Sequence, residues 1–330
     1  MEVKYFGPDQ VDAVVAGSGP AGLAATSELL SAGASVLMVD ARKVIGTPIR
    51  CGELTRKKLF EVLGLEPQKG WLRWTLKRQG GALVVDRAKL ELDFSRMLSH
   101  KGAFVSDSTT VVSVGEYDGE GRRVTIDTPA GQRDVAARCV IAADGTSSRV
   151  AQMCGVDTRL PLKKMGACYA YRLADVDLEA PYTYLLRYLK NMYPFYFWII
   201  PSGAREANVG VVLPGDQGFR ARRMLDEKLR SSKKIKGGKI KQHIIGCYPV
   251  AKPMETPYAD GLMITGTAAR MVDPRTGEGI WQAAVSGRLA AKTLLDAKDT
   301  TAESLALYRE KLSELYENLL SKWAFPQESE

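Results

Sequence analysis

The sequence contains few histidines and no long apolar run. Only His100 and His243 occur in 330 residues, so histidine-rich metal sites and histidine-based catalytic triads are not expected. The longest apolar run, Phe195 to Pro201, is much shorter than the roughly 20 residues that a membrane-spanning helix needs. No charged-then-apolar leader opens the chain, so we expect a cytoplasmic protein that is neither integral to a membrane nor exported.

The cysteines are scattered and contain no Cys-x-x-Cys pair. This spacing argues against a zinc site or a disulfide framework, and it fits a reducing cytoplasm. We therefore expect no metal site. The five cysteines are Cys51, Cys139, Cys154, Cys168 and Cys247.

The net charge of +8 lies in one segment. Residues 219–242, called the basic segment below, contain ten Lys or Arg and two acids, and the rest of the chain holds 36 charges of each sign. This distribution does not favour nucleic-acid binding. It predicts either a solvated helix and turn or a surface for an anionic membrane, a phosphorylated substrate or an acidic partner protein. Its basic residues are Arg220, Arg222, Arg223, Lys228, Arg230, Lys233, Lys234, Lys236, Lys239 and Lys241.

The first forty residues predict one strand, helix, strand unit. Residues 11–16 (VDAVVA) have the character of a buried strand, the sequence GSGPAG follows at 17–22, and a second strand-like run at 34–40 ends in an acid. The two strands should pair in parallel. Gly17 would permit the tight turn, Gly19 would let a pyrophosphate approach the backbone, and Gly22 would let the helix pack on the strand. Pro20 and Ala21 open the helix, whose free N–H groups face the phosphates.

The acid that ends the second strand is Asp40. It lies about twenty residues beyond the glycines, where such units bind the ribose hydroxyls of an adenosine. We include Ala41 and Arg42 in this cofactor site.

Further elements along the chain predict two lobes. A helical pattern spans residues 84–102, and residues 103–128 alternate like antiparallel strands. Another buried strand, at 138–143, is followed by Asp144 and Gly145. Strand-like stretches with 12 of the 26 aromatic residues fill 163–250, and a strand-glycine-helix pattern returns from Gly261. We expect a discontinuous cofactor domain at 1–160 and 257–298, a substrate domain at 161–256, and a C-terminal helix at 299–330.

Two later motifs resemble those of flavoproteins of the p-hydroxybenzoate hydroxylase type. They are IAADGTSSRV at 141–150 and GLMITGTAARMVDPRTGEGIWQAAVSG at 261–287. The resemblance implies bound FAD and an α/β fold, with a Rossmann-like FAD-binding domain, an inserted β-rich (α+β) substrate domain and a C-terminal helix. It implies FAD contacts from Asp144, Gly145, Gly266, Thr267, Pro274, Gly277, Gly279 and Ile280.

One of these positions departs from the family. Thr267 follows Gly266 where the family has an Asp that binds the ribityl chain. A hydroxyl can still hydrogen-bond there, but as a neutral and therefore weaker partner. The helix that starts near Gly279 carries a partial positive charge at its N-terminus, which would stabilise a reduced flavin.

Two other stretches resemble the geranylgeranyl reductases within that group. The first is PIRCGE at 48–53, which is similar to their cysteine loop near the flavin ring, so that Arg50, Cys51 and Gly52 would lie at the cofactor. The second is YPFYFWIIP at 193–201, similar to their PxxYxWxFP substrate motif. Matching positions are Tyr196, Trp198 and Pro201; Tyr193 and Ile200 depart from it.

An aromatic slot would suit a polyprenyl chain, which offers only apolar surface. The alternative is that the motif residues at 196 and 198, on one face of a strand, simply pack the core of the substrate lobe. Cys51 is the candidate catalytic residue, either tuning the flavin site or donating a proton during double-bond reduction, with Arg50 lowering its pKa. The other four cysteines are expected in the core, and both histidines are expected to be structural.

The resemblance implies an FAD-dependent oxidoreductase that reduces carbon–carbon double bonds of a geranylgeranyl or polyprenyl lipid. The electron donor would be NAD(P)H or a reduced carrier such as ferredoxin, and peripheral contact with an anionic membrane is a further expectation. Three alternatives remain open at this point. They are a flavin-dependent monooxygenase or halogenase of the same fold, a non-catalytic flavin or prenyl-lipid-binding protein, and a peripheral membrane-interaction protein.

Overall fold

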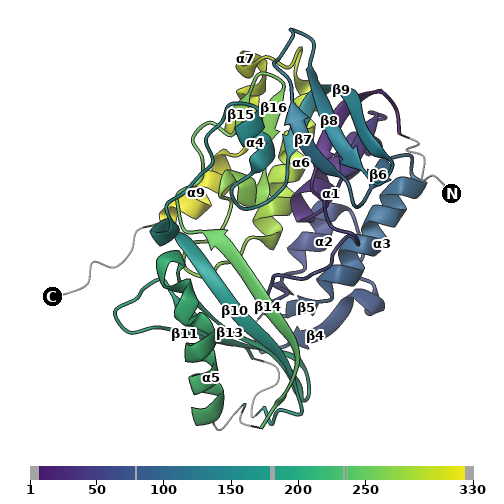
Figure 1. The fold of residues 1–330 in the computed structure, drawn as a ribbon. Helices are drawn as coiled ribbons and strands as arrows, with labels where there is room; N and C mark the ends of the chain where they lie inside the picture. Colours follow the sequence, from purple (N-terminus) through teal and green to yellow (C-terminus); the bar gives the residue numbers. More distant parts are fainter. Residues whose placement is uncertain (1–6, 79, 179–182, 233–234, 236, 324–330) are drawn as a thin grey trace.

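The computed structural model describes residues 7–78, 80–178, 183–232, 235 and 237–323. Two large sheets form the body of the chain, one in the upper and one in the lower half of Figure 1. The strands of the first sheet are β1 (Gln10–Ala16), β2 (Val36–Val39), β6 (Phe104–Ser106), β7 (Thr110–Val114), β8 (Arg122–Thr128), β9 (Gly131–Ala142), β15 (Tyr258–Ala259) and β16 (Leu262–Ile264).

The first sheet runs in the order β15-β16-β9-β1-β2-β6. In addition, β8 pairs with β9, and β7 pairs with β8. β1 pairs in parallel with β2, as the sequence predicted. β16 pairs in parallel with β9, so strands more than a hundred residues apart meet in one sheet. The segment 103–128 differs from the prediction: β7 and β8 are antiparallel, but β6 lies parallel to β2.

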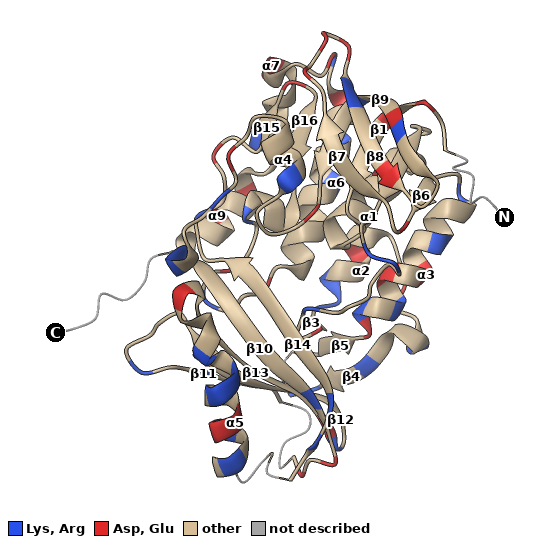
Figure 2. Cartoon of the chain, in the orientation of Figure 1, with Lys and Arg blue, Asp and Glu red and all other residues tan. Residues whose placement is uncertain are grey.

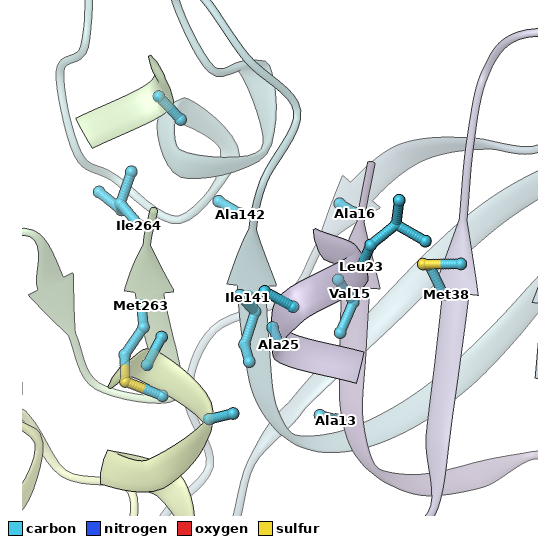
Figure 3. Close-up of a cluster of buried hydrophobic side chains, with 14 of the residues drawn as sticks. Ala13, Val15, Ala16, Leu23, Ala25, Met38, Ile141, Ala142, Met263 and Ile264 are labelled. Carbon is cyan, nitrogen blue, oxygen red and sulfur yellow. The ribbon is translucent and has the colours of Figure 1, made fainter. Parts of the chain in front are cut away.

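Two helices, α1 (Pro20–Ser31) and α6 (Ile280–Asp296), pack side by side against this sheet. The strands that they cover are apolar on both faces, as expected of a covered parallel sheet. Figure 3 shows Val15, Met38, Ile141 and Met263 on four neighbouring strands, and Leu23 of α1 belongs to the same core. This continuous core holds the carboxyl ends of the strands in fixed positions.

The second sheet is antiparallel, with the order β11-β12-β13-β10-β14. One of its faces is covered by the helix α5 (Ala221–Ser231), and the opposite face packs toward the small sheet described next. Its strands are β10 (Met165–Ala174), β11 (Leu185–Tyr188), β12 (Tyr196–Gly203), β13 (Glu206–Pro214) and β14 (Lys239–Pro249).

A three-stranded sheet at residues 54–85 was not foreseen. It consists of β3 (Leu54–Thr55), β4 (Leu72–Leu76) and β5 (Ala82–Val85), with α2 (Lys58–Leu63) and the short 3-10 turn η1 (Lys69–Trp71) between the first two strands. The predicted helix from residue 84 begins later, as α3 (Arg87–His100), because Asp86 caps it by accepting a hydrogen bond from the Lys89 amide at 3.0 Å. The side chains of the small sheet share a core with the second large sheet.

The C-terminal segment is helical but not one continuous helix. It forms α7 (Ala302–Leu305), α8 (Leu307–Lys311) and α9 (Ser313–Ser321). Leu305, Tyr308, Leu312 and Leu315 are buried at the predicted spacing, so the amphipathic pattern was right although the helix axis is broken. Residues 324–330 of the predicted helix lie outside the described residues. No helix among the described residues is long and apolar enough to cross a bilayer.

Candidate functional site

The glycine turn between β1 and α1 is fixed by close backbone contacts. Gly17 has a φ of +106°, and a Cβ there would lie 2.4 Å from the Ala143 carbonyl oxygen. A Cβ on Gly22 would lie 1.8 Å from the Gly17 carbonyl oxygen. Around Gly19, in contrast, no described atom lies within 4 Å of the added Cβ, and no described side chain caps α1. This turn fits a pyrophosphate, which needs backbone N–H groups and room to approach them.

Asp40 lies at the end of β2 and is already surrounded by protein donors. Its carboxylate accepts hydrogen bonds from the Ser18 amide at 2.9 Å and from the Arg42 amide at 2.8 Å, as well as from both side chains. Burial alone would raise the pKa of Asp40, but the hydrogen bonds and charge of Arg42 hold it below its usual value. Arg42 also bonds Glu91 at 3.2 Å, whereas Ala41 is exposed. Nothing in the spacing of the sequence indicated the roles of Ser18 and Glu91.

Asp144 follows β9 and organises the turn into the helix α4 (Arg149–Met153). Its Oδ2 accepts a hydrogen bond from the Val150 amide at 3.1 Å, and burial raises its pKa. Its Oδ1 is buried without a hydrogen-bond partner among the described residues. Gly145 has a φ of +83°, and no described atom lies within 4 Å of an added Cβ there. The Asp144 Oδ2 therefore holds the turn, and the space beside the Gly145 backbone is open.

The strand β16 brings the second flavin motif onto the glycine turn. Gly266, with a φ of +62°, begins the 3-10 turn η4 (Gly266–Ala269), and its amide donates to the Ser286 hydroxyl at 2.9 Å. A Cβ on Gly266 would lie 2.9 Å from the Ala21 Cβ and 3.2 Å from the Ala283 Cβ. Thr267 is half-buried beside it. The first turns of α1 and α6 therefore lie together.

The N-terminus of α6 is a second site for negative charge. Gly279 is the N-cap residue, Ile280 begins the helix, and no described side chain caps it. Burial raises the pKa of the preceding Glu278, whose carboxylate lies 3.9 Å from the Arg56 guanidinium. A helix of 17 residues presents a partial positive charge at this end. Pro274 is buried in the loop that leads to it.

The cysteine loop lies between the two sheets. The Cys51 sulfur accepts a hydrogen bond from the Glu53 amide at 3.2 Å, and the thiol is half-buried. The guanidinium that interacts with it belongs to Arg87 of α3: burial alone would lower the pKa of Arg87, but the Glu91 carboxylate and the Cys51 thiol raise it. Arg50, by contrast, is exposed. The sequence could not indicate Arg87, which lies 36 positions away.

The substrate motif on β12 is tied to this loop through one asparagine. The Trp198 indole N–H donates to the Asn208 Oδ1 at 2.8 Å, and the Asn208 amide donates to the Cys51 carbonyl oxygen at 3.3 Å. A Cβ on Gly52 would lie 2.9 Å from the Ile200 side chain. Asn208 is buried in an apolar strand, and a lone asparagine in such a run is the signal in the sequence that could have indicated its role.

Two tyrosines connect the second sheet to the loop before α6. The Tyr196 hydroxyl donates to the Thr276 carbonyl oxygen, and a Cβ on Gly277 would lie 2.7 Å from that hydroxyl and 3.2 Å from the hydroxyl of Tyr248 on β14. Burial raises the pKa of both tyrosines well above the usual value. The face of β12 that bears Tyr196 and Trp198 therefore meets the second flavin motif.

Pro201 is not brought to this face. It is paired with Ala207, which belongs to the core beneath α5 together with Phe197 and Ile199. Alternation along a strand puts these residues on the side opposite Tyr196. The structure therefore brings together two of the three residues that the substrate motif offered.

A group of buried charges supports the cysteine loop. Glu53, only 1 % exposed, has a φ of +63° and forms ion pairs with Arg172 of β10 and, at 3.8 Å, with Arg73 of β4. Its Oε1 also accepts a hydrogen bond from the Arg87 amide at 3.2 Å. Left-handed backbone is uncommon for a glutamate and often marks functional sites. Sequence reasoning missed this group because its members lie on four separate elements.

Of the other cysteines, Cys139 is buried in the core of the first sheet with Cys154 packed against it, whereas Cys168 is half-buried against the cluster of Tyr196 and Trp198 and lies near Cys51. Burial raises the pKa of Cys139 to about 12 and that of Cys154 to about 11. Cys247 is exposed, so its expected place in the core was wrong; it lies on β14, at the edge of the second sheet. His100 ends α3 at the surface, and the His243 ring hydrogen-bonds the Tyr169 hydroxyl at 2.9 Å.

The chain matches known proteins over nearly its whole length. Residues 73–307 match the family model described as an FAD binding domain. A digeranylgeranylglycerophospholipid reductase of Methanosphaerula palustris is 33% identical over 91% of this chain and 80% of that protein, and one of Methanoculleus marisnigri is 34% identical over 90% and 80%.

Solved structures give the same grouping. The fold is similar to that of a geranylgeranyl bacteriochlorophyll reductase-like protein from Thermoplasma acidophilum, with a TM-score of 0.88, 25% identity and coverage of 96% of this chain and 86% of that chain. The myxobacterial chondrochloren halogenase is more distant, with a TM-score of 0.71, 20% identity and coverage of 98% and 84%, and it shares the fold alone. The chain is thus an FAD-dependent oxidoreductase with the expected α/β fold, and it belongs to the digeranylgeranylglycerophospholipid reductase family.

Proposed function

We propose that this chain reduces carbon–carbon double bonds in the polyprenyl chains of a geranylgeranyl-type glycerophospholipid. The observation that carries the proposal is the chain of contacts from Trp198 through Asn208 to the Cys51 carbonyl. It connects the aromatic motif of the second sheet with the cysteine loop, and the same face meets the loop before α6 through Tyr196. A substrate on this face would lie between the cysteine and the flavin motif.

The residues at the ends of β1, β2 and β16 suit FAD. The open backbone at Gly19 and the uncapped N-terminus of α1 would take its pyrophosphate. Asp40 and Arg42 would lie toward the adenosine ribose, and the Thr267 hydroxyl toward the ribityl chain. When bound, FAD supplies the hydride for reduction of a double bond. The N-terminus of α6 would stabilise negative charge at the edge of the reduced ring.

The slot for the prenyl chain would be formed by Tyr196 and Trp198. Their ring centroids are 5.9 Å apart and the ring planes are tilted by 58°. Both rings belong to the apolar cluster between the second sheet and the three-stranded sheet. A prenyl chain gains binding energy by leaving water, at about 25 cal/mol per Å² of buried apolar surface. The indole N–H and the Tyr196 hydroxyl are held by protein partners, so this face offers the chain mainly ring surface.

Cys51 would deliver the proton that completes the reduction. The Cys51 thiol transfers a proton to one alkene carbon while the other carbon receives the hydride, and the sulfur is left as a thiolate. The Glu53 amide and the Arg87 guanidinium, which already interact with this sulfur, would stabilise the anion. Solvent would then return a proton to the half-buried sulfur.

The domain division at 1–160, 161–256 and 257–298 is part of the same proposal. The first and last of these segments would bind FAD, the middle segment would bind the lipid, and residues 54–85 would line the junction because they share a core with the second sheet. The electron donor would be NAD(P)H or a reduced carrier such as ferredoxin. The basic segment would approach an acidic carrier or an anionic membrane; Lys233, Lys234 and Lys236 of that segment lie outside the described residues.

The test is an anaerobic turnover of the purified protein. The bound chromophore is identified by its spectrum and mass, reduced, and mixed with a digeranylgeranylglycerophospholipid. We expect reoxidation without oxygen and a product heavier by one hydrogen molecule per reduced bond. Turnover that needs oxygen would favour a monooxygenase or halogenase, and lipid binding without reoxidation would favour a binding protein.

A Cys51→Ser variant tests the proton delivery, with Cys247→Ser as the matched control at an exposed cysteine. We expect slower turnover of Cys51→Ser with an unchanged rate of flavin reduction by an artificial donor. Equal turnover in both variants would remove the proton role of Cys51 and leave the lipid assignment standing.

A further inference from the structure

Two short turns beside the second sheet carry strongly exposed apolar side chains. Leu162 is 65% exposed in η2 (Leu162–Lys164), and Phe219 is 84% exposed in η3 (Gly215–Arg220). Among the described residues these are the highest exposures of any large apolar side chain. We call Leu162 and Phe219 the apolar tip. Because exposing such side chains to water is unfavourable, a pair of them on neighbouring turns suggests contact with an apolar phase.

The turns that carry the tip are fixed by packing. A Cβ on Gly215 would lie 2.5 Å from the Leu162 carbonyl oxygen, and one on Gly218 would lie 2.7 Å from the Ala167 Cβ. Both turns therefore lie against each other and against the start of β10. The positions of Leu162 and Phe219 are therefore set by turns that pack on the second sheet.

Basic side chains flank the tip. Lys163, Lys164 and Arg220 are all exposed and lie within two residues of Leu162 or Phe219 in the sequence. Figure 2 shows further basic residues along α5, which begins directly after η3. Arg223 there is partly offset by Glu227 at 3.0 Å, so the three residues beside the tip are the ones best placed to meet an anionic surface.

The tip also lies close to the proposed lipid slot. Gly166 follows η2 by two residues, and a Cβ there would lie 2.8 Å from the ring of Tyr248. Tyr248 contacts Gly277 in the loop before α6. The exposed apolar side chains and the slot therefore lie at the same end of β10.

We propose that the apolar tip inserts into the interfacial layer of an anionic lipid bilayer, with Lys163, Lys164 and Arg220 against the headgroups. This deepens the proposed function, on which it rests for the membrane origin of the substrate, by assigning the surface through which the lipid is reached. The surface that two side chains can bury is far smaller than the roughly 800 Å² per partner that a standard protein interface buries. A bilayer, in contrast, binds single apolar side chains that are flanked by basic residues.

The experiment measures binding of the full chain to vesicles of mixed phosphatidylcholine and phosphatidylglycerol. Phe219→Asp should weaken binding by about tenfold or more, because one apolar side chain no longer enters the interface. Lys163→Glu with Lys164→Glu should weaken it similarly at low salt, and less at high salt. The matched controls are Val112→Asp, an exposed apolar residue on β7, and Lys101→Glu with Arg133→Glu on the other side of the chain; these should bind as the original protein does.

The outcomes separate this inference from the function. If the original protein does not bind vesicles, or if Phe219→Asp binds as tightly as Val112→Asp, the apolar tip is not a membrane contact. A dimer in solution that Phe219→Asp dissociates would assign the tip to a second copy instead. Phe219→Asp should still hold FAD and reduce lipid dispersed in detergent, and that assay fails only if the proposed function itself is wrong.

Discussion

The glycine turn and the cysteine loop differ in how their geometry is determined. At the turn, the partners are close in sequence or directly across the sheet: Gly22 meets Gly17, and Gly17 meets Ala143. At the loop, the Cys51 sulfur and carbonyl meet Arg87 and Asn208 from other elements. A motif can therefore be read in the first region, whereas the second exists only after the sheets have packed.

The difference also concerns what holds each region. Shape alone fixes the turn, because a single added methyl group would collide with backbone atoms. Polar and charged contacts fix the loop, and their central members, Glu53 and Asn208, are buried. Glycine substitutions should therefore disrupt the turn through steric overlap, whereas losses at the loop should follow from groups left unpaired.

The largest effect is expected at Gly22. Gly22→Ala places a Cβ 1.8 Å from the Gly17 carbonyl oxygen, so α1 must move off β1, and we expect a loss of at least about 3 kcal/mol of stability. Gly19→Ala is the matched control: it meets no described atom within 4 Å, should change stability by about 1 kcal/mol or less, and should weaken FAD binding. Thermal unfolding and flavin titration distinguish the two. Equal stability of both variants would contradict the steric account.

Loss of Glu53 should have the next largest effect. Glu53→Ala leaves Arg172 and Arg73 without their buried carboxylate, and breaking a buried pair costs about 3–5 kcal/mol. Denaturant unfolding measures the loss. Asp134→Ala, which breaks an exposed pair with Arg123, is the control and should cost at most about 1 kcal/mol. A similar cost for both variants would mean that the loop does not depend on the buried charges.

Asn208 should have a smaller effect on stability and a clear one on turnover. Asn208→Ala leaves the Trp198 indole N–H unpaired and frees the Cys51 carbonyl, at a cost of about 1–3 kcal/mol. Because the cysteine loop is no longer positioned, kcat should fall more than the affinity for FAD. Asn318→Ala, an exposed asparagine on α9, should change neither.

A double-mutant cycle of Asn208→Ala with Trp198→Phe separates the bond from the packing. Strict additivity of the two substitutions would show that the indole N–H bond does not transmit the effect.

The smallest effect is expected at Asp40 and depends on pH. The pKa of Asp40 is lower in the folded chain than its usual value of 3.8. Its stabilisation is therefore complete above that value and is lost as the pH falls through the lower folded pKa. The original protein should lose stability in acid more steeply than Asp40→Asn, as measured by thermal unfolding across this range. Parallel curves would mean that the pairing with Arg42 adds no stability.

Much of the nucleotide side could be predicted from the sequence. The run before Gly17 and the acid at Asp40 predict β1, α1 and β2, and the structure confirms the parallel pairing of the two strands. Alternation could not show that β6 joins the same sheet in parallel, because its three residues carry no period of their own. The predicted helix includes Val84 and Val85, the last two residues of β5, because a short apolar run suits either element until the cap at Asp86 is seen.

At the site, the sequence suggests single residues but not their partners. It predicts Cys51 at the flavin and Tyr196 and Trp198 at the substrate, and the structure adds Asn208 between Trp198 and the Cys51 carbonyl and Arg87 at the sulfur.

The sequence by itself determined the elements whose rules are local: the glycines at the end of β1, the apolar strands, the helix starts and the excess of basic residues. Periodicity and steric limits act within a few residues, so they can be read along the chain. Only the tertiary structure decided which arginine meets Cys51, how Glu53 is neutralised and that the turns bearing Leu162 and Phe219 pack against each other. Those contacts depend on how separate elements pack, and no spacing along the chain records the distances between them.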